Sequence, residues 1–322
     1  MNTRMRVLTL TNMYPTRRFP AFGVFVRDQV QSLRRLGIEV DVLFLNPRET
    51  RLNYCTGPLR LRRQLARKSY NLIHAHYVFS GAIALTQRRL PVIVTHHGVE
   101  TLRGWTAPLC RAVSRRVDLT LVVSDEMAGA LNVPAEVLPC GVDLSRFKPM
   151  SREKARQRLG FPDSGRLVLF AGEARPEKRR HLIVEAVTRL REAGHDIQLV
   201  EVQNQPHLKM PLFFNACDLL VQVSEHEGSP MVIKEGVACN LPFVSTDVGD
   251  VFQRFGQVPG CFSCRGEVGD LVSKIPLALG FGRLADGRHY LEDVSLDVIA
   301  RRLVDLYTRL IASGLGGGEQ KR

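Results

Sequence analysis

Short apolar runs alternate with amphipathic stretches along the first half of the chain. The runs at residues 7–11, 39–45, 72–75, 91–95 and 119–123 have the length and β-branched content of buried strands. Residues 25–36 repeat their apolar positions at helical spacing and end at Gly37, and further helical stretches lie between most of the runs. This alternation predicts repeated β–α units around a parallel sheet.

The same pattern restarts in the second half of the chain. Ser151 opens a short charged helix, and strands are predicted at 167–171, 197–202, 219–223 and 243–246. Helices are predicted at 178–192, 210–216 and 230–239, and a last helix at 295–311 keeps a 3.6-residue period. The second half therefore predicts another α/β domain.

These patterns favour an α/β protein with two doubly wound, Rossmann-like domains that face each other across a cleft. The expected domains are residues 1–149 and 150–294. A C-terminal helix at 295–313 is expected to return to the first domain, followed by a flexible tail at 314–322. Ligands of such sheets bind outside the carboxyl ends of the strands, so the cleft is the expected site.

The composition is that of an ordinary globular chain. Of 322 residues, 44% are hydrophobic and 24% are charged, which excludes a disordered or fibrous protein. No apolar run approaches the roughly 18 residues that span a bilayer, and the first residues predict a strand rather than a signal peptide. Seven cysteines, an odd number, do not form a disulfide framework, so a reducing cytoplasm is expected.

Positive charge is concentrated in the first half. Residues 1–150 hold 22 Lys and Arg against 10 Asp and Glu, whereas residues 151–322 hold 23 against 22. Such a field attracts anionic lipid, lipid phosphate or nucleic acid. A helix at 59–68 would place Arg60, Arg63 and Arg67 on one side and Leu61 and Leu65 near another, which suits docking on an anionic membrane and equally suits a solvated helix.

The segment with the clearest chemistry lies at residues 224–250. It follows an apolar strand and opens a helix, with Ser229 as the expected N-cap and Pro230 as the first helical residue. The amides and dipole at such a helix start attract phosphate. Glu227 precedes this point and Glu235 follows it, so two carboxylates bracket a phosphate site. That arrangement fits a nucleotide sugar.

This segment resembles the Glu-x7-Glu donor signature of family 4 of the retaining glycosyltransferases, which have the GT-B fold. The resemblance implies that Glu235 accepts hydrogen bonds from ribose hydroxyls and that Glu227 holds the sugar. It implies donor contacts at the helix start as well, made by Gly228, Ser229, Pro230, Met231 and Val232.

Other family landmarks follow in order along the chain. Gly23, after the first strand, matches a glycine that brings backbone close to the diphosphate, with a plain turn glycine as the alternative. His97 matches an active-site histidine, while His96 is expected to face the packed side of its strand. A metal site at the neighbouring histidines is disfavoured by strand alternation.

The glycine loop at residues 170–180 departs from the family pattern. Lys178 occupies the position of a cation that holds the diphosphate, but Glu173 stands where the family usually has arginine. We expect Arg175 to substitute for it, with a plain surface cation as the alternative. The chain is also shortened between Val202 and Asp218, beside the place where the nucleobase is expected.

The resemblance implies a metal-independent retaining glycosyltransferase without a cofactor. Its donor would be a nucleotide-diphosphate sugar of UDP or GDP type, and its acceptor a glycan or lipid-linked molecule of cell-surface polysaccharide or glycolipid synthesis. The chain contains no Asp-x-Asp, so cations and dipoles are expected to hold the diphosphate. A cytoplasmic protein is expected, peripheral at the inner face of an anionic membrane.

Three other interpretations stay open at this point. Glu173 and the shortened second half would suit a catalytically inactive scaffold or partner subunit. A pI near 9.8 is compatible with a nucleic-acid-binding protein, although the chain lacks a recognisable nucleic-acid module, so nucleic acid is not an expected partner. A nucleotide-sugar epimerase would use the same fold.

Overall fold

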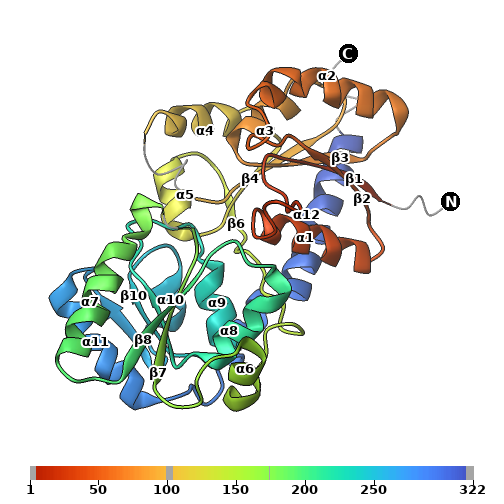
Figure 1. The fold of residues 1–322 in the computed structure, drawn as a ribbon. Helices are drawn as coiled ribbons and strands as arrows, with labels where there is room; N and C mark the ends of the chain where they lie inside the picture. The colour runs from red at the N-terminus through yellow and green to blue at the C-terminus, as the bar shows by residue number, and fades with distance from the viewer. Residues whose placement is uncertain (1–4, 99–103, 174, 317–322) are drawn as a thin grey trace. The chain divides into compact units, whose positions relative to one another are not determined.

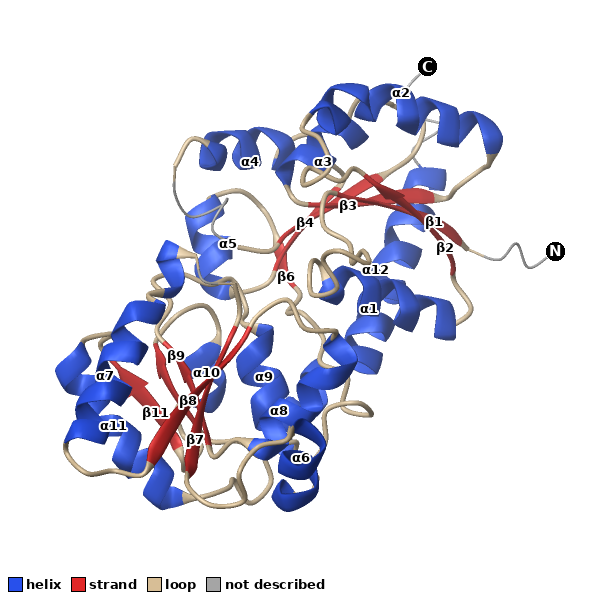
Figure 2. Cartoon of the chain, in the orientation of Figure 1, coloured by secondary structure: helices blue, strands red, loops and turns tan. Residues whose placement is uncertain are grey.

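Two compact units make up the chain, each built around a parallel sheet. The computed structural model describes residues 5–98, 104–173 and 175–316 (Figures 1 and 2). The first unit comprises Met1–Thr16, Phe22–Gly141 and Leu296–Arg322, and the second comprises Arg17–Ala21 and Val142–Ser295. Besides the short excursion at 17–21, the main chain crosses between the units at 141/142 and 295/296, whereas the crossings predicted from the sequence are at 149/150 and 294/295.

The first unit has a six-stranded sheet in the order β2-β1-β3-β4-β5-β6, with every pairing parallel. Its central strands are buried on both faces because helices cover both, as is usual for parallel sheets. The strands are β1 (Arg6–Thr11), β2 (Glu39–Phe44), β3 (Leu72–His76), β4 (Val92–His96), β5 (Leu119–Val122) and β6 (Glu136–Val137).

Two groups of helices cover this sheet (Figure 2). One face packs against α2 (Leu52–Arg67), α3 (Val78–Ala84), α4 (Thr106–Ser114) and α5 (Asp125–Leu131), which share a core with β1, β3 and β4. The other face carries α1 (Val24–Arg35), which contacts α12 (Leu296–Gly316). The predicted return of the C-terminal helix to the first domain is therefore confirmed. That helix extends beyond the predicted end, and residues 317–322 of the predicted tail lie outside the described residues.

The second unit has a five-stranded parallel sheet in the order β11-β10-β9-β7-β8. Helices α7 (Arg180–Glu192) and α11 (Val268–Phe281) share a core on one face, while α6 (Arg152–Leu159), α8 (Met210–Ala216) and α9 (Met231–Ala238) lie on the other (Figure 2). The strands are β7 (Arg166–Ala171), β8 (Ile197–Val202), β9 (Leu219–Gln222), β10 (Phe243–Thr246) and β11 (Cys261–Cys264). Short helices η2 (Pro176–Lys178), η3 (His207–Lys209), α10 (Val251–Phe255) and η4 (His289–Val294) occupy the connections.

The helix predicted at 178–192 begins later than the pattern indicates. Lys178 ends the η2 turn, Arg179 has a left-handed backbone with φ of 46°, and α7 starts at Arg180. At this break the Arg179 Nε donates to the carbonyl of Val223, 44 positions along the chain, at 2.7 Å. Lys178 is thus a turn residue at the carboxyl end of the sheet and not part of a helix. Among the described helices, none is long and apolar enough to cross a bilayer.

Candidate functional site

Two loops of the second unit meet where the neighbouring strands β7 and β9 end. The η2 turn follows β7, and the loop at 223–230 follows β9. The amide of Glu225 donates to the carbonyl of Glu177 at 2.9 Å, and Arg179 donates to Val223 in the same region. Parallel pairing of β7 and β9 therefore brings the predicted glycine loop and the first half of the carboxylate signature together.

Lys178 and Glu227 are in direct contact across these loops. The Lys178 Nζ donates to Glu227 Oε1, and the two side chains are only 12% and 18% exposed. Both residues were predicted from sequence to bind one ligand, and the structure places them as an ion pair. In this part-buried pair, Lys178 offers a cation for an anionic ligand group. Glu227, in contact with it, offers oxygen atoms that accept hydrogen bonds from hydroxyl groups.

Helix α9 begins one residue later than predicted and lacks the predicted cap. Pro230 has an extended backbone with ψ of 106° and is itself the residue before the helix, which starts at Met231. No side chain caps the helix, because the Ser229 hydroxyl is engaged by Asp250 and Lys234. The expectation that Ser229 is the N-cap is therefore wrong. An uncapped helix start keeps hydrogen-bonding capacity in its first amides, near Met231 and Val232.

A buried polar network fixes the loop between Glu227 and α9. Lys234 is 1% exposed, and its Nζ lies 2.6 Å from Asp250 Oδ2, which also accepts from the Ser229 hydroxyl at 3.1 Å. Gly249, with φ of 60°, has no room for a side chain, since a Cβ would lie 2.5 Å from the carbonyl oxygen of Gly228. Lys234 and Asp250 were not predicted from the sequence, although a lysine inside a largely apolar helix is a signal for a buried charge pair.

Glu235 belongs to a second buried chain of polar contacts. The Glu235 Oε1 lies 2.7 Å from Nε2 of His207, and both side chains are 7% exposed. The other ring nitrogen of His207, Nδ1, lies 2.9 Å from a guanidinium nitrogen of Arg146, which pairs with Asp143 at 3.2 Å. His207 and Arg146 were not predicted from the sequence as site residues. His207 lies in the shortened segment, where the sequence offered no partner for it.

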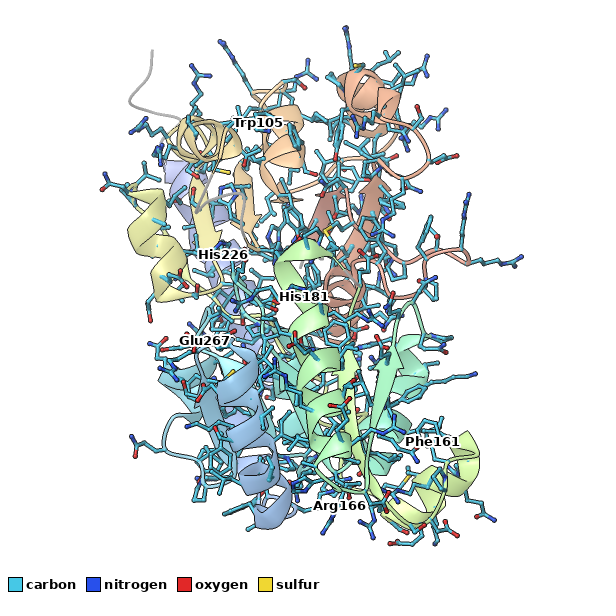
Figure 3. The ribbon with its side chains drawn as sticks, turned by 60° about the vertical axis from the view of Figure 1, so that its left-hand side comes forward. Trp105, Phe161, Arg166, His181, His226 and Glu267 are labelled. Atoms are coloured by element: carbon cyan, nitrogen blue, oxygen red, sulfur yellow. The ribbon has the colours of Figure 1, made fainter. Side chains whose placement is uncertain are left out.

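Arg175 stands apart from the Lys178–Glu227 pair. Its side chain is 55% exposed and pairs with Glu177 at 3.2 Å. Glu173 is exposed on the same loop. His226, labelled in Figure 3, is half-buried next to Glu227. The proposed substitution of Arg175 for the family arginine stays a prediction.

Gly23 in the first unit is required by the protein's own backbone. It is the N-cap of α1 with φ of 69°, and a Cβ there would lie 2.5 Å from the carbonyl carbon of Met13. Crowding by Met13 and Tyr14 is sufficient to explain why this residue is a glycine. This agrees with the alternative interpretation of Gly23 as a plain turn glycine. A contact with diphosphate stays a prediction.

Three histidines form a stacked ladder at the carboxyl ends of β3 and β4. The rings of His74 and His76 stack at 4.4 Å, and those of His76 and His97 at 5.1 Å. His76 Nδ1 lies 2.9 Å from His97 Nε2, and the opposite nitrogen of His97 lies 3.5 Å from the Cys140 sulfur. His97 is half-buried, and its ring also packs on Phe25 at 4.7 Å.

Burial keeps these histidines neutral near pH 7. Desolvation lowers the pKa of His76 to about 3, and desolvation together with the neighbouring rings holds the pKa of His74 and His97 well below the ordinary value. His96 is fully buried on the opposite side of β4, as predicted, with Nε2 at 3.1 Å from the Ser114 hydroxyl. A neutral His97 can donate or accept one hydrogen bond at each ring nitrogen.

Metal-ligand geometry and disulfides are not found in the described parts of the chain. No group of three His, Cys, Asp or Glu side chains among residues 5–98, 104–173 and 175–316 is placed to hold a metal ion. All seven cysteines are free thiols. Cys261 and Cys264 lie on β11, and burial raises the pKa of Cys261 to about 12, so this thiol is unreactive at neutral pH.

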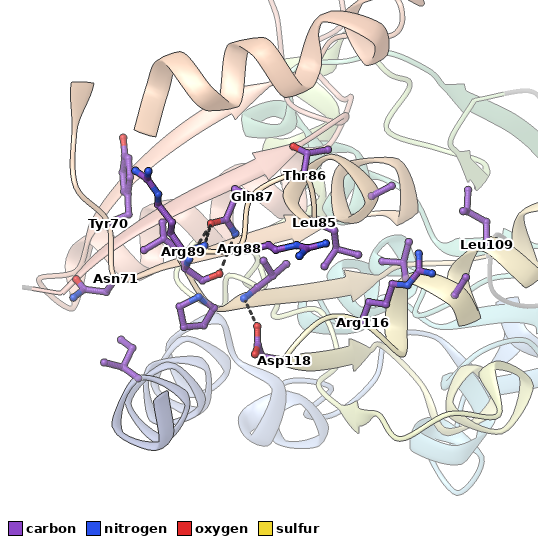
Figure 4. Close-up of a pocket in the computed structure, with 17 residues that line it drawn as sticks. Tyr70, Asn71, Leu85, Thr86, Gln87, Arg88, Arg89, Leu109, Arg116 and Asp118 are labelled. Carbon is purple, nitrogen blue, oxygen red and sulfur yellow. Dashed lines mark hydrogen bonds between the residues drawn. The ribbon is translucent and has the colours of Figure 1, made fainter. Parts of the chain in front are cut away.

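A cavity of about 1140 Å³ lies in the first unit at the amino ends of β3 and β4 (Figure 4). Exposed Arg88, Arg89 and Arg116 line it together with apolar side chains. The carboxylate of Asp118 there accepts from the Val92 amide at 2.8 Å. None of the predicted site residues lines this cavity, because His97 lies at the opposite end of the strands.

Comparison with known protein families matches both halves of the chain. Residues 22–146 match the profile of Glycosyltransferase Family 4, and residues 165–279 match that of Glycosyl transferases group 1. The first match contains Gly23 and His97, and the second contains Lys178, Glu227 and Glu235.

Two curated relatives illustrate the similarity. A Bacillus subtilis (strain 168) protein, named as the teichuronic acid biosynthesis glycosyltransferase TuaC, is 26% identical over 325 residues, covering 79% of this chain and 84% of the relative. The D-inositol 3-phosphate glycosyltransferase of Mycobacterium bovis (strain BCG / Pasteur 1173P2) is 25% identical over 244 residues. That alignment covers 61% of this chain and 51% of the relative, so this chain spans about half of its length.

Solved structures share the fold at low sequence identity. Sucrose-phosphate synthase from Thermosynechococcus elongatus superposes with a TM-score of 0.79 at 18% identity, covering 96% of this chain and 100% of that one. Anabaena HepE in complex with UDP and glucose has a TM-score of 0.69 at 18% identity, covering 95% and 100%. The two parallel sheets with flanking helices thus match a known two-sheet architecture.

Proposed function

We propose that this chain, a glycosyltransferase of the GT-B type, is a metal-independent, retaining enzyme of cell-surface polysaccharide or glycolipid synthesis. It would transfer a sugar from a nucleotide-diphosphate donor to a glycan or lipid-linked acceptor. The observation that carries the proposal is the contact between Lys178 and Glu227 beside the uncapped start of α9.

Each donor group has a partner of matching chemistry in the second unit. Lys178, with help from Arg175, would hold the diphosphate, while the first amides of α9, near Met231 and Val232, complement its charge. Glu227 and the amides after Gly228 would fix the sugar, and Glu235 would accept from the ribose hydroxyls. Donor binding would replace part of the Lys178–Glu227 pair with ligand contacts.

The proposed transfer needs no protein nucleophile. The bond between the sugar C1 and the diphosphate oxygen breaks, and the acceptor oxygen bonds to C1 from the same face. The acceptor proton passes to the departing diphosphate oxygen. Lys178 and the α9 dipole stabilise the negative charge that develops on the diphosphate, a role that a divalent metal plays elsewhere. His97, neutral at pH 7, would orient a sugar hydroxyl.

Named ligands of similar proteins support a UDP-type donor, with a GDP-type donor as the other candidate. HepE structures were solved with UDP and with UDP-glucose. TuaC is named for teichuronic acid biosynthesis, which supports a glycan acceptor. The first half of the chain, with 22 Lys and Arg against 10 Asp and Glu, would attract an anionic or lipid-linked acceptor.

Peripheral contact with an anionic membrane is part of the proposal, and α2 is the element that supports it. Arg62, Arg63 and Arg67 are exposed, whereas Leu61 is buried in the core. Arg60 was expected to lie with Arg63 and Arg67 on the basic side of this helix. Instead it donates to the Phe44 carbonyl at 3.0 Å and is not available to lipid. Apolar side chains are also exposed on this unit, including Trp105 (labelled in Figure 3). Nucleotide sugars and free thiols both favour a cytoplasmic location.

A donor panel tests the enzymatic proposal. Transfer and donor hydrolysis would be measured with UDP-, GDP- and ADP-sugars, with and without EDTA. We expect both Lys178→Ala and Glu235→Ala to lose activity. For Lys178→Ala the expected loss is about 100-fold, the size typical of removing one group that stabilises charge in the transition state. Lys154→Ala, at an exposed lysine on α6 of the same unit, is the matched control. Absence of binding to every nucleotide sugar would instead favour the scaffold, and abolition by EDTA would refute metal independence.

A vesicle assay tests the proposed membrane contact separately from the proposed enzymatic activity. Arg62, Arg63 and Arg67 changed together to Gln should weaken binding to phosphatidylglycerol-containing vesicles by about 100-fold, at about 1 kcal/mol per cation. Binding to neutral phosphatidylcholine vesicles should stay low for both proteins.

The matched control removes three exposed arginines of the second unit, Arg158, Arg189 and Arg191. It should leave vesicle binding within about twofold, because the proposed contact does not involve that unit. An equal loss in both triple variants would show a nonspecific charge effect and would remove the proposed role of α2.

A further inference from the structure

Burial of the Glu235 carboxylate is unfavourable unless the protein compensates for the hydration that it loses. Glu235 lies on α9 directly after Lys234, whose charge is paired with Asp250, and it is 5% exposed. A buried carboxylate is stable only where donors compensate for its lost hydration. Among the described residues, the single hydrogen bond of this carboxylate is the one between Oε1 and Nε2 of His207 at 2.7 Å.

Arg146 determines which nitrogen of His207 carries the proton. Its guanidinium nitrogen lies 2.9 Å from Nδ1, and a guanidinium has only donors. Nδ1 must therefore accept, so Nε2 carries the hydrogen and donates to Glu235. Asp143 pairs with Arg146 at 3.2 Å, and the Phe147 ring packs on His207 at 5.2 Å, so both the tautomer and the ring plane are fixed.

This arrangement occupies one carboxylate oxygen and leaves the other for a ligand. Oε2 of Glu235 has no hydrogen-bond partner among the described residues. We propose that His207 is a positioning residue for Glu235, held in the donating tautomer by Arg146, so that Oε2 is presented to the ribose hydroxyls of the donor. This inference rests on the proposed function, which assigns the ribose to Glu235.

The shortened segment of the chain supplies this histidine. His207 opens the η3 turn directly after Pro206, and it reaches Glu235 from the stretch between β8 and α8. In this proposal the shortened segment contributes the side chain that orients a donor-binding carboxylate. The sequence signal that could have indicated this role is a histidine next to a proline in a short connection between a strand and a helix.

A cycle of protein and ligand changes tests the proposal. His207→Phe keeps a planar ring and removes the Nε2 donor. The probes are the nucleoside diphosphate that binds most tightly in the donor panel and its 2′,3′-dideoxy form, with dissociation constants from calorimetry. We expect His207→Phe to weaken the ribose form about 10- to 100-fold and the dideoxy form less than twofold. His207→Gln, whose amide can still donate, should recover most of the affinity.

Controls separate positioning from general damage. His195→Phe, at an exposed histidine of the same unit, should leave both ligands unchanged. Equal losses for both ligands in His207→Phe would overturn the proposal, since a purely structural effect does not distinguish ribose from dideoxyribose. Should His207→Phe fail to fold, Arg146→Gln provides the same comparison with an expected smaller discrimination, and equal losses there would also overturn it.

The proposed function fails in a different way. If Glu235→Gln does not weaken the ribose form relative to the dideoxy form, the assignment of ribose to Glu235 is wrong whatever His207 does. If Glu235→Gln discriminates between the ligands and His207→Phe does not, only the positioning role is overturned.

Discussion

The buried pair of Lys234 and Asp250 gives the sharpest prediction about the donor loop. The Lys234 side chain is 1% exposed and that of Asp250 is 8% exposed, with 2.6 Å between Nζ and Oδ2. Lys234→Met keeps the length of the chain and removes the charge. Asp250 Oδ1 has no partner among the described residues, so the carboxylate would then depend on the Ser229 hydroxyl alone.

The expected loss is about 3–5 kcal/mol of unfolding free energy, the range for removing one partner from a buried ion pair. Chemical denaturation in urea, followed by circular dichroism, measures it. Lys154→Met on α6, at an exposed lysine of the same unit, is the matched control and should stay within about 0.5 kcal/mol. Donor affinity should fall as well, because Ser229 and the Gly228 backbone lose their anchor.

The double variant Lys234→Met with Asp250→Leu distinguishes a pair from two independent residues. Removing both charges leaves no unpaired carboxylate, so the double variant should be more stable than Lys234→Met alone. A loss below 1 kcal/mol in Lys234→Met, or strict additivity in the cycle, would refute the reasoning. Donor affinity unchanged in a folded Lys234→Met protein would show that the network does not support the loop.

Three other features give predictions of their own. Arg156→Met should cost about 3–5 kcal/mol, since the buried guanidinium is 1% exposed and hydrogen-bonds to five carbonyls and a carboxylate; a urea transition unchanged from wild type would contradict this. Acidification should destabilise the protein below about pH 6.5, because the folded-state pKa of His76 is lowered to about 3 and the unfolded chain binds the proton first; its share is about 2 kcal/mol between pH 6.5 and 5. Replacing His76 by Gln should flatten that pH profile, and a profile that stays equally steep would assign the dependence to other groups. Gly249→Ala should lower Tm and donor affinity together, since its φ is 60° and a Cβ would strike the Gly228 carbonyl; a neutral effect on both would show that the loop relaxes.

The alternation of apolar and amphipathic segments predicted nine of the eleven strands of the two sheets, whereas the short edge strands β6 and β11 were not predicted. Parallel strands buried on both faces read as continuous apolar runs, so β1, β3 and β7 lie close to where the pattern predicted them. The chemistry at strand ends was equally accessible, because Glu227 and Lys178 follow strands that a parallel sheet places side by side. Local spacing determines these features, and local spacing is what a sequence displays.

Features that depend on partners distant in the chain were decided only by the tertiary structure. Ser229 has the ideal chemistry of an N-cap, yet Asp250 and Lys234 compete for its hydroxyl, so the helix starts without a cap. The bond between His207 and Glu235 joins residues 28 positions apart through a turn whose direction no periodicity encodes. A hydrogen bond depends on where two groups meet in space, and that position follows from the packing of the whole unit.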